Sequence, residues 1–169
     1  AVAWRDDDGN AGSRGGSSHD IFAKIVSVTD ADGNPVDTPI VSADEILVNT
    51  YTSGSQYDPA ITSLSDGGFV VTWRDNNGSH DGGSGVDVFG QRFDAAGEKV
   101  GDDFLVNADA DSGSQYEPAM ADLGNGKFIV TWRDDSGGSH DKNDNDSTTG
   151  SSYDVRGQIF TTVDDNGDA

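Results

Sequence analysis

The tripeptide Trp-Arg-Asp occurs three times in this chain, at Trp4–Asp6, Trp73–Asp75 and Trp132–Asp134. Two copies lie in longer similar stretches: residues 55–75 and 114–134 are identical at 13 of 21 positions, with a constant offset of 59. A period of this length indicates one supersecondary unit that is copied along the chain. Because such arrays usually offer a surface rather than a reaction, we expect a protein that is not an enzyme.

Short runs of alternating apolar residues, separated by Gly- and Asp-rich turns, predict strands throughout. In the middle copy we expect four strands, at Pro59–Leu64, Phe69–Arg74, Val86–Phe93 and near Asp103–Asn107. No segment has helical periodicity, so the predicted class is all-β. Repeated four-stranded antiparallel units of this length are typical of β-propeller blades. A β-sandwich with internal repeats is the alternative.

The repeats divide the chain into one continuous β-repeat segment with a partial first copy, a complete second copy and a partial third copy, at 1–54, 55–113 and 114–169. We expect self-association or neighbouring repeats to complete the outer edges. From Asp20 to Leu47 the chain advances 27 residues, whereas the equivalent step from Asp87 to Leu105 takes 18. We attribute this difference to surface loops of unequal length.

The charge of the chain excludes several partners. The net charge is −21, from 31 acidic and 10 basic side chains, which repels nucleic acids and anionic membrane surfaces. No apolar run approaches the ~18 residues of a membrane span, so we expect no membrane insertion. Cysteine is absent, so disulfides cannot stabilise the fold. Divalent cations would both offset the charge and replace the missing disulfides.

Calcium is the predicted cofactor, because it takes six to eight oxygen ligands and the loops after Trp-Arg-Asp are rich in Asp, Asn and Gly. The candidate ligands lie in these three loops and at the residues where each loop returns to a strand: Asp6, Asp8, Asn10, Asp20, Asp75, Asn77, Asp81, Asp87, Asp134, Asp141, Asn143, Asn145 and Asp154. The alternative interpretation is that Asp, Asn and Gly simply form good polar loops.

All three histidines, His19, His80 and His140, lie in Ser-His-Asp tripeptides. A catalytic triad needs three converging side chains, whereas adjacent residues generally point apart, so we expect no triad. A role in loop packing or hydrogen bonding is the prediction, and a transition-metal site is the alternative.

Two further residue types recur at fixed positions. Tyr57 and Tyr116, each preceded by Gln, are suited to a sugar-binding site, or alternatively to the capping of a strand. The arginines of the three Trp-Arg-Asp copies are expected to form ion pairs with a nearby loop Asp.

The stretch from DPAITSLSDGGFVVTWRD through VDVFGQRFDAAGEKVGDDFLVN resembles the tandem repeat of large secreted calcium-binding bacterial proteins of the RTX (hemolysin-type) and adhesin kind. The third copy matches through Gly157–Phe160, and the first departs from the pattern at Ala23–Ile25. The resemblance implies secretion to the cell surface, calcium dependence and a structural or adhesive role, such as an extracellular fibre or matrix component. It names no ligand, and a carbohydrate-binding, lectin-like module is the alternative function.

Overall fold

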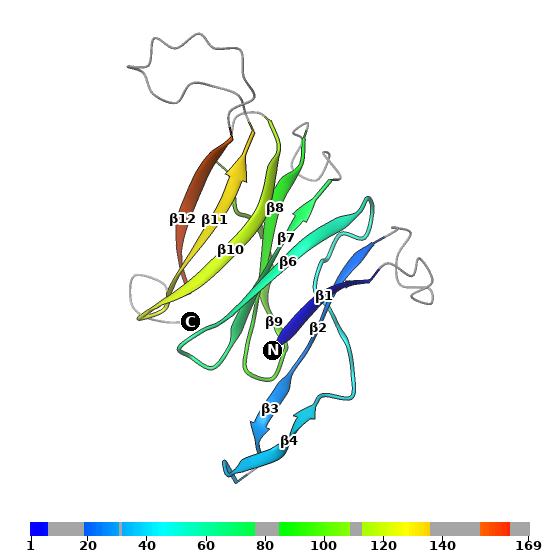
Figure 1. The fold of residues 1–169 in the computed structure, drawn as a ribbon, viewed down its shortest axis with the longest axis vertical. Helices are drawn as coiled ribbons and strands as arrows, with labels where there is room; N and C mark the ends of the chain where they lie inside the picture. The colour runs from blue at the N-terminus through cyan, green and yellow to red at the C-terminus, as the bar shows by residue number, and fades with distance from the viewer. Residues whose placement is uncertain (7–18, 31, 77–84, 109–112, 136–152, 163–169) are drawn as a thin grey trace.

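The computed structural model describes residues 1–6, 19–30, 32–76, 85–108, 113–135 and 153–162. Over these residues the chain is all-β without a helix, and its strands form four antiparallel sheets, none closed into a barrel (Figure 1). The all-β prediction is therefore confirmed. None of the described segments is a helix long and apolar enough to cross a membrane.

The central sheet contains four strands, which follow one another in chain order: β6 (Gln56–Ser63), β7 (Phe69–Asp75), β8 (Asp87–Phe93) and β9 (Lys99–Leu105). Each strand is antiparallel to the next. These are the four strands predicted for the middle copy, although β6 and β9 begin earlier than the alternation indicated.

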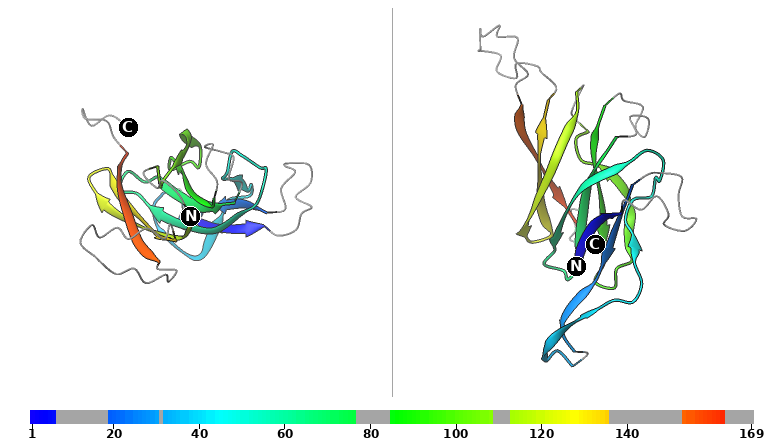
Figure 2. Two further views of the ribbon diagram at one scale, coloured as in Figure 1. Left: turned by 90° about the horizontal axis from the view of Figure 1, so that it is seen from above. Right: turned by 45° about the vertical axis from the view of Figure 1, so that its right-hand side comes forward.

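A three-stranded sheet flanks the central sheet on each side, as two views show (Figure 2). The first sheet contains β1 (Val2–Asp6), β2 (Asp20–Lys24) and β5 (Ile46–Leu47). The third sheet contains β10 (Gln115–Gly124), β11 (Lys127–Asp134) and β12 (Asp154–Thr161). The three tryptophans occupy the same register position, because the residues opposite them are Phe22, Phe89 and Arg156.

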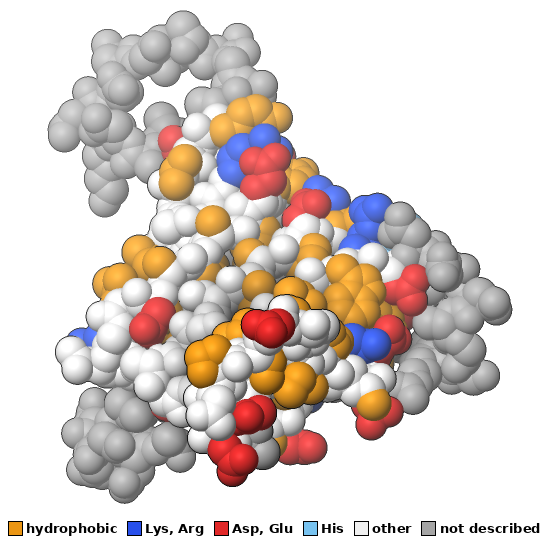
Figure 3. Space-filling model, turned by 60° about the horizontal axis from the view of Figure 1, so that its bottom comes forward, with side chains coloured by type: hydrophobic (Ala, Val, Ile, Leu, Met, Phe, Trp, Pro, Cys, Tyr) orange, Lys and Arg blue, Asp and Glu red, His pale blue; other side chains and the backbone are white. Residues whose placement is uncertain are grey.

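A fourth, two-stranded sheet corrects one expectation. The additional residues between Asp20 and Leu47 form the hairpin of β3 (Val26–Thr29) and β4 (Pro35–Val41), so the difference in length is not a loop. The hairpin projects from the first sheet, and from below hydrophobic and acidic side chains lie together on it (Figure 3). Its exposed apolar residues are Val28, Ile40 and Val41.

Tight Asp-x-x-Gly turns close two of the hairpins. The Asp94 carboxylate accepts a hydrogen bond from the backbone N–H of Glu98 at 2.9 Å, and Gly97 adopts φ 86, a conformation that favours glycine. The carboxylate of Asp30 accepts from the N–H of Asn34 at 2.9 Å in the equivalent turn. Hydrogen bonds from Asn34 hold the pKa of Asp30 below its usual value. Short polar side chains thus satisfy the turn backbone locally.

The central sheet is covered on both faces. On β7, Phe69, Val71 and Trp73 point to the first sheet, whereas Val70 points to the third sheet. The first core also contains Ile21, Ala23, Val48, Phe89 and Phe93, and the second contains Leu64, Val88, Val106, Phe128, Val130 and Trp132. A strand with two buried faces needs apolar residues at consecutive positions, which explains the run Phe-Val-Val.

The outer face of the third sheet lacks such a cover in the described part of the chain. Val155 on β12 is 83% exposed, and Ile159 and Leu123 are also exposed. Since Leu64 and Val88, the counterparts of Leu123 and Val155 in the central sheet, are buried, this face has the apolar character of an interior surface.

Candidate functional site

Two aspartates face one another across the base of each of the three hairpins that carry a long loop. The six residues are direct Cα partners in the antiparallel registers: Asp6 with Asp20, Asp75 with Asp87, and Asp134 with Asp154. Side chains directly opposite in an antiparallel pair lie about 5 Å apart at Cβ, and like charges there are unfavourable. The strand ends therefore concentrate negative charge at three equivalent places.

A chain of buried side-chain amides ties the first of these places to the second. The Asn49 amide nitrogen donates to the Asp20 carboxylate at 2.8 Å and to Gln56 Oε1 at 3.4 Å. Gln56, fully buried at the start of β6, donates in turn to Asp75 at 3.3 Å. The carboxylates of two neighbouring sheets are thus joined through two amides, which stabilise their negative charge without a cation.

The same chain recurs between the central and third sheets. Asn107 donates to Asp87 at 2.8 Å, and its amide nitrogen lies 3.0 Å from the side-chain amide of Gln115. With its oxygen and nitrogen exchanged, the Gln115 amide donates to Val86 O at 2.9 Å and to Asp87 at 3.2 Å, so in both orientations it belongs to this network. Gln115 then lies 3.5 Å from the Asp134 carboxylate, at the limit of a hydrogen bond. A backbone hydrogen bond accompanies these side-chain contacts, since the N–H of Gln115 donates to Val86 O at 2.7 Å. The sheets are therefore connected at this end by a repeated polar interface.

Arginine and tyrosine side chains alternate across all three sheets beside these amides. The guanidinium group of Arg74 lies over the Tyr57 ring at 4.6 Å and over Tyr116 at 5.4 Å. Arg5 also lies over Tyr57, and Arg133 lies between Tyr116 and Tyr153. We call these alternating side chains the arginine–tyrosine column. Cation–π contacts of this kind contribute about 0.5–1 kcal/mol each at exposed sites.

Each inner arginine also pairs with an acidic residue on the neighbouring strand. Arg74 lies 3.4 Å from Asp58, and Arg133 lies 3.4 Å from Glu117. Both acids have positive φ, at 51 and 54, where β6 and β10 shift register before a proline. These two ion pairs form with residues of a β-bulge, because the bulge turns the acid towards the arginine. Most of the loop aspartates lie outside the described residues, so the expected pairing with a loop Asp stays a prediction.

The arginine–tyrosine column argues against the sugar-binding alternative, because arginines already contact the tyrosine rings. Tyr57 has a guanidinium group near its ring from Arg5 and another from Arg74, and Tyr116 has the same arrangement. A sugar that stacks on either ring would have to displace an arginine. The Gln side chains beside them are buried in the polar interface, so they do not line a surface site.

His19 is the histidine that the described residues include. Its Nδ1 lies 3.2 Å from Ser55 Oγ, and its ring lies 5.0 Å from the ring of Tyr57. These contacts join the first sheet to the start of β6, which agrees with the predicted role in packing and hydrogen bonding. His80 and His140 lie outside the described residues.

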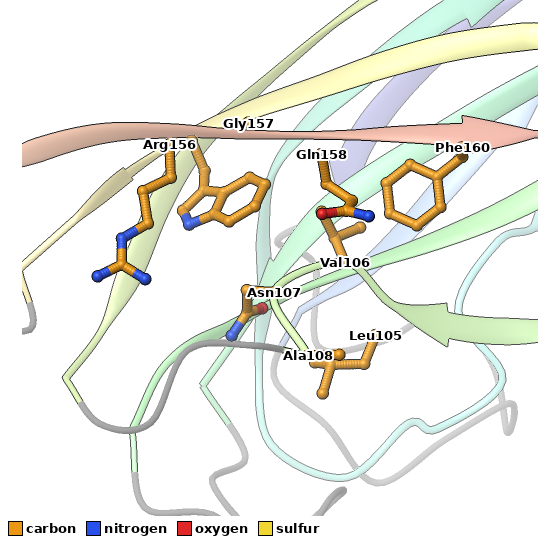
Figure 4. Close-up of a pocket in the computed structure, with 9 residues that line it drawn as sticks. Leu105, Val106, Asn107, Ala108, Arg156, Gly157, Gln158 and Phe160 are labelled. Carbon is orange, nitrogen blue, oxygen red and sulfur yellow. The ribbon is translucent and has the colours of Figure 1, made fainter.

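A cavity of about 490 Å³ opens between the end of β9 and the strand β12 (Figure 4). Apolar lining comes from Leu105, Val106, Trp132 and Phe160, and polar lining comes from Asn107, Arg156 and Gln158. Arg156 forms an ion pair with Asp134, with its Nε 2.6 Å from the carboxylate. The cavity is therefore close to the polar interface of the central and third sheets.

The predicted calcium ligands divide into two groups. The structure describes the six opposed aspartates, whereas the other candidates lie outside the described residues: Asp8, Asn10, Asn77, Asp81, Asp141, Asn143 and Asn145. Among the residues that are described, no group of three or more His, Cys, Asp or Glu is placed to hold a metal. Calcium binding stays a prediction.

Sequence reasoning did not select the amide residues Asn49, Asn107, Gln56 and Gln115 as a connected interface. The signal was present, because Leu-Val-Asn occurs twice and Ser-Gln-Tyr occurs twice at matching places in the repeat.

Comparison with known proteins gives no match: no protein family, no curated protein and no solved structure is significantly similar to this chain.

Proposed function

We propose that this chain is a non-catalytic, calcium-stabilised structural or adhesive β-repeat module of a secreted bacterial protein, with its sheets arranged as propeller-like blades. The observation that carries the proposal is the opposed aspartate pair at the base of each Asp- and Asn-rich loop. The extracellular setting comes from the resemblance to RTX-type repeats.

Bound calcium would both reduce the charge repulsion at the hairpin bases and stabilise the fold. Each hairpin base supplies two carboxylates, and the adjoining loop supplies further carboxylate, amide and backbone oxygens, which is the ligand chemistry that calcium takes. The amides of Asn49 and Asn107 already hold Asp20 and Asp87 in place. A bound cation would offset the repulsion within each pair, and its binding energy would add to the stability of the fold.

Self-association is part of the proposal. The outer face of the third sheet exposes Leu123, Val155 and Ile159, and the counterparts of Leu123 and Val155 in the central sheet, Leu64 and Val88, are buried. Exposed apolar residues on one sheet face favour an interaction site there.

The test is the thermal unfolding and particle size of the chain in millimolar calcium, in magnesium and in excess chelator. One site stabilises the fold by about 2.7 kcal/mol when free calcium is 100 times its dissociation constant. We therefore expect the melting temperature to rise by several degrees in calcium, with larger particles, and to rise much less in magnesium.

A matched pair of variants ties the effect to the proposed ligands. Asp20→Asn with Asp87→Asn keeps the oxygen that accepts from each asparagine but removes two charges from the hairpin bases. Asp102→Asn with Asp122→Asn removes the same charge from exposed positions elsewhere. The calcium shift should fall in the first double variant and persist in the second. An equal shift in both, or none in the unaltered chain, would remove calcium from the proposal.

A further inference from the structure

The strand β12 has one edge without a partner among the described residues, because β12 pairs with β11 alone. The strands at the same place in the other two sheets, β2 and β8, are each covered by a further segment, β5 and β9. Both covering segments continue into Leu-Val-Asn, at Leu47–Asn49 and Leu105–Asn107. These are the two occurrences of Leu-Val-Asn in the 169 residues.

The Leu-Val-Asn segment binds β8 through its backbone and its asparagine. The N–H of Val106 donates to Val88 O at 2.8 Å, and the N–H of Val88 donates to Asn107 Oδ1 at 2.7 Å. The Asn107 amide nitrogen completes the contact with Asp87. The first sheet repeats this arrangement, since the Ile21 N–H donates to the Asn49 side chain at 2.8 Å.

β12 presents the same backbone and side-chain groups, and none of the described strands covers them. Its sequence Asp-Val-Arg-Gly-Gln, from Asp154 to Gln158, differs from that of β8, from Asp87 to Gln91, at one residue. The carboxylate of Asp154 and the N–H of Val155 correspond to the two groups that an asparagine satisfies in the other sheets.

Glycine supplies the second element of the site. A Cβ placed on Gly90 would lie 2.6 Å from the ring of Phe104, so glycine at this position makes room for the aromatic ring on the adjacent strand. Gly157 occupies the same position in β12, and the nearest atom to a Cβ there is the Thr131 methyl group, at 3.2 Å. Gly157 thus leaves room for an incoming aromatic ring.

The cavity supplies the third element. Leu105 in β9 packs against the core between the first and central sheets. A leucine at the same place beside β12 would enter the cavity that Val106, Trp132 and Phe160 line. A neighbouring cavity of about 290 Å³ has Phe104, Phe128 and Phe160 in its lining and continues the apolar surface.

We propose that the free edge of β12 binds an extended peptide segment of the type Asp-Asp-Phe-Leu-Val-Asn, which adds a fourth strand to the third sheet. The backbone of the peptide would pair with β12, its Phe would cover Gly157, its Leu would fill the cavity, and its Asn would bridge Asp154 and Val155 N–H. Pairing along an edge gives affinity, and the side chains give specificity. The inference rests on the repeat equivalence behind the proposed function, but it requires no calcium.

The test uses the whole chain and a labelled peptide of residues 99–108, Lys-Val-Gly-Asp-Asp-Phe-Leu-Val-Asn-Ala. Fluorescence anisotropy should give a saturable binding curve, and hydrogen exchange should slow at the backbone amides of β12. Replacing the peptide's Asn by Ala should weaken binding about tenfold or more, because the Asp154 carboxylate and the Val155 N–H lose a partner. Replacing its Phe by Ala should also weaken binding.

Two variants of the chain locate the binding site. Gly157→Val removes the room for the ring, and Asp154→Ala removes an exposed carboxylate with little risk to folding. Both should weaken binding, whereas Asp122→Asn, an exposed change outside β12, should not. Titration in calcium and in chelator separates this proposal from the calcium proposal, since peptide binding should persist in both.

Three outcomes would overturn the inference. The first is the absence of saturable binding at millimolar peptide. The second is binding that neither protects β12 nor responds to the two variants. The third is protection of β12 that grows with protein concentration and that the peptide does not displace, which would assign the edge to a second copy of the chain.

Discussion

The strands β8 and β12 have nearly the same sequence and opposite environments. Asp-Val-Phe-Gly-Gln-Arg-Phe in β8 and Asp-Val-Arg-Gly-Gln-Ile-Phe in β12 differ at two positions. Val88 is 0% exposed and Val155 is 83% exposed, and Gln91 is buried whereas Gln158 is exposed. The pattern of a strand therefore specifies that it pairs, but the neighbouring sheets decide which of its faces is buried.

One of the two differences shows how the third sheet is adapted. Phe89 lies beside Trp73, with ring centroids 6.4 Å apart, in the interior between two sheets. Arg156 stands at this position in β12 and reaches the buried Asp134. The third sheet thus replaces an aromatic contact by an ion pair, which an open strand tolerates because the guanidinium group keeps access to water.

The largest expected effect comes from breaking the amide bridge that the central sheet has and that no described residue supplies to β12. Asn107→Ala removes the donor to Asp87 and the acceptor of the Val88 N–H, and it leaves Gln115 without one partner. Loss of a buried hydrogen-bond network around a carboxylate costs about 3 kcal/mol. Urea unfolding should show this loss, and Gln158→Ala, at an exposed position, should change stability by less than about 0.5 kcal/mol. A cost below about 1 kcal/mol for Asn107→Ala would contradict the structural role of the bridge.

A smaller effect separates the two valines directly. Val88→Ala should destabilise the fold by about 2 kcal/mol, because two buried methyl groups are lost and a cavity remains. Val155→Ala should change the free energy of unfolding by less than about 0.5 kcal/mol. Denaturant titration of both variants gives the comparison. Equal costs would mean that β12 is covered in solution. If the costs differ as expected, the Val155 cost should rise with bound peptide.

The smallest effect concerns an ion pair of the central sheet that the equivalent positions of the third sheet cannot form. Asp66 accepts from Arg92 at 2.7 Å, whereas the third sheet has Asn125 and Ile159 at these positions. Burial raises the pKa of Asp66, but hydrogen bonds from Arg92 and the Gly68 N–H, with the arginine charge, outweigh it, so the pKa is lowered from 3.8.

Because the folded pKa of Asp66 lies below its unfolded value, its contribution is present above about pH 4 and is lost as pH falls through the folded pKa. Asp66→Asn should cost about 0.5–1 kcal/mol at pH 7. The difference between this variant and the unaltered chain should shrink by pH 3, as measured by urea unfolding at both values. A difference that stays constant would show that the ionised pair contributes nothing.

Much of the fold was predictable from local pattern. Alternation and turn residues located the four strands of the central sheet, since Asp94 and Gly97 have few alternatives to a tight turn. The hairpin of β3 and β4 was not predicted, because its strands are mostly exposed and lack clean alternation. The packing of the three sheets could not be predicted from the alternation within strands, because it depends on which sheet faces pack against one another.

The candidate site was predicted in part. The aspartates were selected by residue type, and register alone then brings Asp75 opposite Asp87. The amide partners were missed because Asn49 and Gln56 come from different sheets, and polar residues near turns are usually exposed. The continuity of the arginine–tyrosine column was missed for the same reason, because the contacts Arg5–Tyr57 and Arg74–Tyr116 join residues from neighbouring repeats.

The amide bridge also bears on how the chain folds during synthesis. Asn49 and Gln56 are separated by seven residues, and Asn107 and Gln115 by eight, although each pair connects two sheets. The bond between successive sheets therefore forms from a short stretch that leaves the ribosome almost at once. Each new sheet would meet its correct neighbour before a more distant, similar one is made, which protects a repetitive sequence from misassembly.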